Sequence, residues 1–203
     1  MLFDPAAAVR PSPYHWAVSP TCSPRQEAPF SPSTPRFRLT DPGFLPPLLP
    51  IVTAALDERE WEYTTNDDQT FVSFGISADH AAYHCAIFVD DDARLVTMLA
   101  QSTLRVPLEE RPSACELLMR ANHGLLFGNF DLDFSDGEVR YKVSVDVEGG
   151  TLGITMVHTM ITTALDMYEL WYPPLMKVIY GGVTPEDAVA EVDARVAEEG
   201  DDS

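Results

Sequence analysis

The strongest constraint on the fold of this chain is a stretch in which apolar and polar residues alternate on both sides of an Asp-Gly pair. Residues 130–147 read FDLDFSDGEVRYKVSVDV. Alternation is the pattern of a strand with one buried face, and Asp-Gly is a preferred hairpin turn because both of its residues tolerate positive φ. The sequence therefore predicts a β-hairpin with a two-residue turn at Asp136-Gly137, in which Asp133 faces Arg140.

This pairing puts the apolar residues of the hairpin on one face and its charges on the other. The apolar face comprises Phe130, Leu132, Phe134, Val139, Tyr141, Val143, Val145 and Val147. The acids of this stretch also resemble the oxygen ligands of a calcium loop. Counted from Asp131, however, the positions that require glycine and glutamate hold Asp136 and Lys142. We therefore expect the acids to be structural and to bind no metal.

Apolar runs upstream, separated by short acidic turns, predict further antiparallel strands. These runs are rich in aromatic and β-branched residues, and they cover residues 61–65, 70–77, 81–89 and 94–102. Strands that are grouped between helices rarely form a parallel sheet. The sequence thus predicts an α+β fold, a twisted antiparallel sheet packed by helices.

Helices are predicted from apolar periodicity and from cap residues. They cover residues 45–60, 107–126, 152–171 and 175–180, and a last helix begins at Thr184 as its N-cap. The second helix has an apolar stripe of Leu108, Cys115, Leu118, Met119 and Leu125. We expect Pro173 and Pro174 to end the third helix, because proline removes a backbone donor.

The beginning of the chain differs from the rest. Residues 1–50 hold 12 of the 17 prolines, and proline at that density blocks helix and strand alike. We expect a disordered or extended segment at 1–44, one α+β domain at 45–199 and an acidic tail at 200–203. A polyproline ligand for a partner is the alternative role of the first segment.

Deleting residues 1–44 is expected to leave the melting temperature of the domain unchanged. Their proline content leaves few apolar contacts to lose. Calorimetry of the full chain and of a chain that begins at Leu45 checks this. A clearly lower melting temperature of the shorter chain would show that the segment packs on the domain.

The charge is extreme, since 13 basic residues against 32 acidic ones give a net charge of −19, and only Lys142 and Lys177 are lysines. Such a field repels nucleic acid and anionic lipid, so we expect neither as a partner. An acid-rich, lysine-poor composition is typical of proteins that stay soluble in a salty, halophilic cytoplasm. An acidic surface that attracts a basic partner is the alternative.

The melting temperature is expected to rise between dilute and molar potassium chloride. Like charges repel more strongly in the compact state, and salt shortens the Debye length from about 10 Å at 0.1 M to about 3 Å at 1 M. Exposed ion pairs are screened as well, but they contribute little stability. A melting temperature that stays flat or falls over this range would contradict the expectation.

Length and cysteine content suit one domain in the cytoplasm. The chain has 203 residues, and its three cysteines, Cys22, Cys85 and Cys115, form no CxxC pair. No apolar run approaches the roughly 20 residues of a membrane span. The first residues lack the pattern of a secretory signal. We therefore expect a cytoplasmic protein with reduced thiols.

No residue pattern predicts a catalytic or cofactor site. His80 and His84 have a chelating spacing for a helix, but on a strand they lie about 13 Å apart. The stretch GGTLG at 149–153 lacks the GxGxxG spacing and a following lysine. We therefore expect no cofactor and no enzyme activity. The alternative is a hydrolase or metal-dependent enzyme whose residues meet only in three dimensions.

One aromatic cluster is a candidate partner surface. Tyr168, Trp171 and Tyr172 come together at the end of a predicted helix. Aromatic groups with a polar tip are common at protein interfaces. Packing at the core end of that helix is the alternative.

Several motifs, taken in order, resemble the YbjN family of small bacterial proteins. They are Asn122, Gly128-Asn129-Phe130, Asp136-Gly137-Glu138-Val139-Arg140, and Thr184-Pro185-Glu186 with Ala188. The resemblance covers about 45–197. The family is described as sensory transduction regulators, with a fold similar to class I type III secretion chaperones, which dimerise and hold other polypeptides. The resemblance implies a non-catalytic regulatory or chaperone-like homodimer that binds a protein client or regulatory partner.

Overall fold

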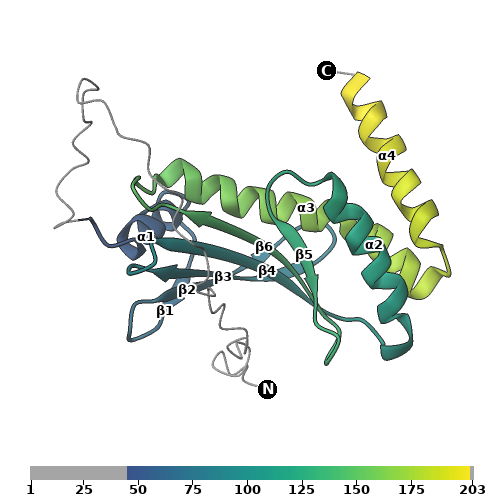
Figure 1. Ribbon diagram of the computed structural model, residues 1–203, viewed down its shortest axis with the longest axis horizontal. Helices are drawn as coiled ribbons and strands as arrows, with labels where there is room; N and C mark the ends of the chain where they lie inside the picture. The colour runs from purple at the N-terminus through teal and green to yellow at the C-terminus, as the bar shows by residue number, and fades with distance from the viewer. Residues whose placement is uncertain (1–44, 202–203) are drawn as a thin grey trace, which may run out of the picture. The chain divides into compact units, whose positions relative to one another are not determined.

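The computed structural model describes residues 45–201, with side chains up to residue 198, and shows a six-stranded antiparallel sheet (Figure 1). The strands are β1 (Tyr63–Thr65), β2 (Phe71–Ser77), β3 (Ala82–Asp90), β4 (Leu95–Arg105), β5 (Asn129–Leu132) and β6 (Glu138–Asp146). Their order in the sheet is β1-β2-β3-β4-β6-β5. The predicted extended segment 1–44 and residues 202–203 of the predicted tail lie outside the described residues.

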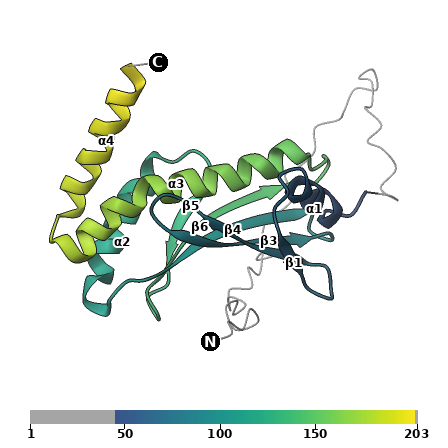
Figure 2. The ribbon, with the colours of Figure 1, turned by 180° about the vertical axis from the view of Figure 1, so that it is seen from behind.

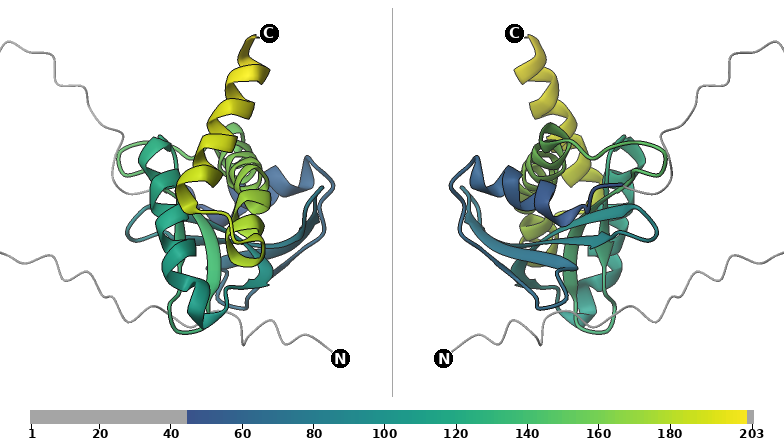
Figure 3. Two further views of the ribbon diagram at one scale, coloured as in Figure 1. Left: turned by 90° about the vertical axis from the view of Figure 1, so that its right-hand side faces the viewer. Right: turned by 90° about the vertical axis from the view of Figure 1, so that its left-hand side faces the viewer.

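Helices pack on one face of the sheet and at one end of it (Figures 2 and 3). They are α1 (Leu49–Asp57), the 3-10 turn η2 (Leu108–Glu110), α2 (Arg111–Gly124), α3 (Ile154–Gly181) and α4 (Pro185–Asp201). Helix α3 contacts β4 and β6, α1 contacts β2, α2 contacts β5, and α4 packs on α2 and α3. This arrangement confirms the predicted α+β class, with a twisted antiparallel sheet packed by helices.

The predicted hairpin is present, but its strands pair two residues away from the predicted register. Asp131, and not Asp133, lies opposite Arg140. The loop therefore holds four residues, 134–137, and the two-residue turn is wrong. A shift of two keeps the strand side chains on their predicted faces. It also moves Phe134 into the loop, where the residue is 53% exposed.

Acidic side chains explain the longer loop. The carboxylates of Asp133 and Asp136 accept hydrogen bonds from the backbone N–H groups of Ser135 (2.7 Å) and Glu138 (2.9 Å). Such bonds stabilise turns from within. In this loop positive φ occurs at Gly137 alone (80°), whereas the two-residue turn requires it at both central positions.

Gly137 also joins the hairpin to the segment that follows β4. Its carbonyl accepts a hydrogen bond from the Val106 N–H (2.8 Å). A Cβ built at Gly137 would lie 2.2 Å from the Val106 carbonyl oxygen. The close approach and the positive φ both require glycine at this position.

The predicted helix break at Pro173 and Pro174 is wrong, because α3 runs through both prolines as one helix of 28 residues. A proline leaves the carbonyl four residues earlier without its N–H partner, which here affects Glu169 and Leu170. The guanidinium of Arg195 on α4 donates to the Leu170 carbonyl (3.2 Å). Tertiary contacts thus hold the helix together where its own hydrogen bonds are interrupted.

The apolar stripe predicted for the second helix is wrong in part. Helix α2 begins later than predicted, so Leu108 lies in the preceding 3-10 turn and is 71% exposed. Met119 is 52% exposed. The buried residues of α2 are Ala114, Leu117, Leu118 and Ala121. Of the predicted stripe Leu118 is fully buried, and two alanines share the buried face with Leu117 and Leu118.

Candidate functional site

One face of the sheet carries no helix within residues 45–201 (Figure 3). At the centre of this open face Phe71 stacks on Phe88, with ring centroids 5.5 Å apart. Ala86 and Leu99 lie beside them in the register of β3 and β4. The surrounding open-face residues are Thr64, Ser73, His84, Asp90, Leu95, Thr97, Gln101, Asp131, Arg140, Lys142, Ser144 and Asp146. An apolar centre with a polar rim is the usual anatomy of a protein-binding surface.

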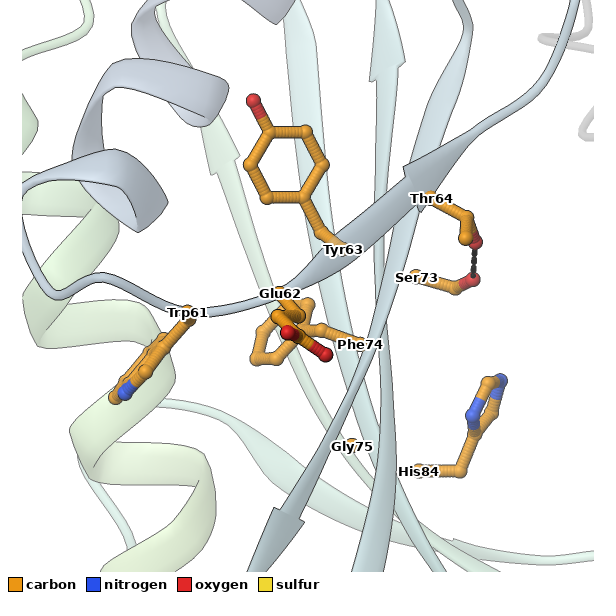
Figure 4. Close-up of a pocket in the computed structure, with 8 residues that line it drawn as sticks. All are labelled: Trp61, Glu62, Tyr63, Thr64, Ser73, Phe74, Gly75 and His84. Carbon is orange, nitrogen blue, oxygen red and sulfur yellow. Dashed lines mark hydrogen bonds between the residues drawn. The ribbon is translucent and has the colours of Figure 1, made fainter.

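At the β1 side the open face ends in a pocket of about 630 Å³, which we call the edge pocket (Figure 4). Its lining residues are Trp61, Glu62, Tyr63, Thr64, Ser73, Phe74, Gly75 and His84. The rings of Trp61 and Phe74 are stacked, with centroids 5.7 Å apart. The pocket therefore has one aromatic wall.

The edge pocket exists because β1 is short. Strand β1 pairs only with residues 72–74 of β2. Residues 75–77 therefore have no strand partner on their outer side in the part of the chain that the structure describes. Gly75 adds no side chain, and a Cβ built there would meet nothing within 4 Å. The edge pocket is therefore the space that remains where no strand lies beside residues 75–77 and Gly75 has no side chain.

The edge pocket combines one carboxylate with an uncharged imidazole. Burial lowers the pKa of His84 below its ordinary value of 6.5, so the ring is neutral at pH 7. Across β1 and β2 the Thr64 and Ser73 hydroxyls share a hydrogen bond of 2.9 Å, the dashed line in Figure 4. Among the eight lining residues Glu62 alone is charged at pH 7.

The opposite edge of the sheet is closed by a side chain of α2. The Asn122 amide accepts a hydrogen bond from the Phe130 N–H (2.7 Å) and donates one to the Phe130 carbonyl (3.0 Å). Both outward backbone groups of this β5 residue are therefore satisfied as a further strand would satisfy them. A covered edge is one way in which proteins prevent unwanted strand pairing.

The aromatic cluster predicted as a partner surface lies mostly in the core. Tyr168 is fully buried, Trp171 is 7% exposed and Tyr172 is half-buried. The Tyr168 hydroxyl donates to the Val139 carbonyl (2.9 Å). This position agrees with packing at a core helix end, and contact with a partner stays a hypothesis for Tyr172 alone.

The two histidines with chelating spacing have different surroundings. The backbone N–H of His80 donates to the Glu169 carboxylate (3.0 Å), its ring Nδ1 lies 2.8 Å from the same oxygen, and Tyr83 also donates to this carboxylate. Burial alone would raise the pKa of Glu169, but the hydrogen bonds from Tyr83 and His80 lower it below its ordinary value. His84 belongs to the edge pocket. Within the described residues, no group of three His, Cys, Asp or Glu side chains is placed to hold a metal ion.

A helix-backed antiparallel sheet with an apolar open face and an edge pocket defines a small α+β domain. The chain belongs to the YbjN family, whose sequence profile, described as "Putative bacterial sensory transduction regulator", matches residues 49–176. The predicted resemblance is thereby confirmed. The matched range ends before Thr184-Pro185-Glu186, so the last of the resembling motifs lies outside it.

Solved structures with a similar arrangement include the crystal structure of "YbjN, a putative transcription regulator from E. coli". It has a TM-score of 0.44 and 15% identity, and the alignment covers 66% of this chain and 89% of that chain. The HopA1-SchA chaperone-effector complex is similar with a TM-score of 0.39 and 13% identity, and the alignment covers 60% of this chain and 90% of that chain. The ExsC-ExsE complex is similar with a TM-score of 0.42 and 12% identity, and the alignment covers 61% of this chain and 89% of that chain. No curated protein matches the chain. Within residues 45–201 no helix is long and apolar enough to cross a membrane.

Apart from His84, the residues of the edge pocket are absent from the candidates that the sequence singles out. Gly75 was the available signal, because an isolated glycine inside a strand marks a bulge or a close approach of another group. The pocket also depends on where β1 ends, and strand ends are poorly determined by local sequence.

Proposed function

We propose that this chain is a non-catalytic regulatory or chaperone-like module that binds another protein in the cytoplasm. The observation that carries the proposal is the open face, where Phe71, Phe88 and Leu99 form an apolar centre that no helix of the described residues covers. The family description supports a regulatory role. The net charge of −19 supports a protein partner over nucleic acid or a membrane.

The second class, a hydrolase or metal-dependent enzyme, requires reactive groups that converge. The edge pocket does bring Glu62, Ser73 and His84 to one place (Figure 4). The Ser73 hydroxyl, however, shares its hydrogen bond with Thr64 across the sheet, where it stabilises β1. The aromatic wall of Trp61 and Phe74 favours binding. We therefore propose neither a reaction nor a cofactor.

Photo-crosslinking tests the proposed function. Benzoylphenylalanine is placed at Phe88 on the open face, and at Leu108, which is 71% exposed but lies in the η2 turn, as the matched control. We expect a covalent adduct with another polypeptide from Phe88 and none from Leu108 in the native host. The adduct's partner, identified by mass spectrometry and purified, is expected to bind Phe88→Glu about tenfold more weakly than the unchanged chain. Equal adducts at both positions would contradict the proposal.

We also propose that the domain is a homodimer, as the family resemblance implies. The apolar residues on several sides of α3 offered a physical motive, but α1, α2, α4 and the sheet all contact this helix within one chain. The open face offers an apolar surface for a second copy. Light scattering in molar potassium chloride is expected to give twice the chain mass of 22.5 kDa. A mass of one chain would contradict the dimer and leave the protein-binding proposal standing.

A further inference from the structure

The edge pocket and the free part of β2 indicate what kind of segment a partner would present. We propose that residues 75–77 of β2 accept an extended, positively charged segment of a partner protein, which adds to the sheet as a further strand. This inference rests on the proposed function, because it names the part of a protein partner that the module would hold.

The backbone of β2 offers hydrogen-bonding groups at this edge. The Val89 N–H donates to the Thr70 carbonyl (2.8 Å), so Thr70 directs its carbonyl toward β3. Backbone groups alternate in direction along a strand. Gly75 and Ser77 lie an odd number of residues after Thr70. Their N–H and carbonyl groups therefore point to the outer edge of the sheet. Strand β1 pairs no further along β2 than Phe74 and so leaves these backbone groups unpaired. An added strand could form hydrogen bonds with them.

The two edges of the sheet are treated differently. The β5 edge is closed by Asn122, as described above. The β1 edge carries no lysine, arginine or proline in residues 61–80, and its charged side chains there are all acidic. Residues 75–77, which β1 leaves without a strand partner within the described residues, are therefore open to a strand of opposite charge.

The charge of this edge indicates which kind of segment can bind there. Residues 61–80 carry the acids Glu62, Asp67, Asp68 and Asp79. A second copy of the chain would bring the same acids to the same edge, so like-charge repulsion opposes pairing of two copies there. A cationic segment is attracted instead, both locally and by the net charge of −19.

The lining of the edge pocket gives the expected pattern of side chains. Successive residues of an added strand point to opposite faces. Those on the Trp61 side meet the aromatic wall and should be apolar. Those on the open-face side lie over Gly75, near the Glu62 carboxylate and beside the neutral ring of His84, which does not oppose a cation. The segment should therefore alternate apolar residues with lysine or arginine.

A random dodecapeptide library, displayed on phage and selected against the full chain, tests this inference. Enriched peptides are expected to alternate apolar residues with lysine or arginine. The most enriched peptide is then synthesised, and its dissociation constant is measured by fluorescence. Hydrogen exchange of the free and bound chain follows the amides of Gly75 and Ser77, which strand addition should protect.

Two variants remove the edge in different ways. Gly75→Val fills the hollow without a clash, because a Cβ there meets nothing within 4 Å. Ser77→Pro removes an outward N–H and leaves the bonds to β3 in place. Each should weaken binding of the selected peptide about tenfold or more. Gly124→Val, at the end of α2 and away from this edge, is the matched control, because a Cβ there also meets nothing within 4 Å, and it should leave binding unchanged.

The outcomes separate this inference from the proposed function. Peptides without cations, binding that survives both edge variants, or a library with no enriched peptide would overturn the strand-addition inference. The proposed function would still stand if the crosslink at Phe88 captures a partner whose binding Phe88→Glu weakens. Protection of Gly75 and Ser77 together with loss of binding in both variants would support the inference, and melting curves confirm that the variants are folded.

Discussion

Replacing Gly137 with alanine is expected to lower the free energy of unfolding by about 2–5 kcal/mol, the largest effect of a single methyl group in this domain. An alanine at positive φ costs about 1–2 kcal/mol. The added Cβ would also lie 2.2 Å from the Val106 carbonyl oxygen. That overlap can be relieved only by moving the backbone, so the hydrogen bond from the Val106 N–H to the Gly137 carbonyl would also weaken.

Gly75→Ala is the matched control for this substitution. Gly75 does not have positive φ, and an added Cβ there meets nothing within 4 Å. Glycine inside a strand costs about 0.5–1 kcal/mol relative to alanine, so the control should be neutral or slightly stabilising. Urea unfolding of both variants checks the pair. Equal losses of stability would contradict the argument from the close approach at Gly137.

Replacing Asn122 with alanine is expected to lower the free energy of unfolding by about 2–4 kcal/mol. The substitution removes both hydrogen bonds to the Phe130 backbone, and Phe130 is only 1% exposed. The buried Phe130 N–H would lose the Asn122 acceptor, and the carbonyl would keep only the longer hydrogen bond from Asn129 Nδ2 (3.3 Å). The cost of leaving such groups unsatisfied exceeds the net value of an ordinary hydrogen bond.

Two further variants give this prediction its controls. His123→Ala changes the exposed neighbour and should alter stability by less than about 0.5 kcal/mol. Asn122→Asp keeps an acceptor for the Phe130 N–H but loses the donor to the Phe130 carbonyl, so its stability should be intermediate. A chain in which Asn122→Ala is as stable as His123→Ala would show that solvent satisfies the edge of β5.

Local sequence patterns predicted the helices and strands of the fold. The features that these patterns predicted wrongly depend on side-chain contacts that the patterns do not include. The hairpin and the last helix follow from nearby residues, and the Asp187 N–H does donate to Thr184 Oγ1 at the predicted N-cap (3.1 Å). The hairpin register depended on the carboxylates of Asp133 and Asp136, which stabilise a longer loop than Asp-Gly alone favours. Helix α3 continues past its prolines with the Leu170 carbonyl bonded to Arg195, which is distant in sequence.

The candidate site was less accessible to sequence reasoning than the fold. Its apolar centre joins Phe71 and Phe88 from two strands, and only the register of β2 and β3 brings them together. The edge pocket depends on the absence of a strand beside Gly75, which no residue signals directly. The Tyr168 cluster was conspicuous in sequence, yet large aromatic side chains fill cores as readily as they form interfaces.

The strand order has a consequence for synthesis on the ribosome. Strands β1 to β4 form a meander that needs only residues up to Arg105, but β4 pairs next with β6, which follows α2 and β5 in the chain. Strand β4 is the longest, with 11 residues. During translation one side of it must therefore wait for residues 138–146 to leave the exit tunnel. We expect the nascent chain to be most exposed to aggregation in that interval, when its net negative charge would oppose contact with neighbouring nascent chains.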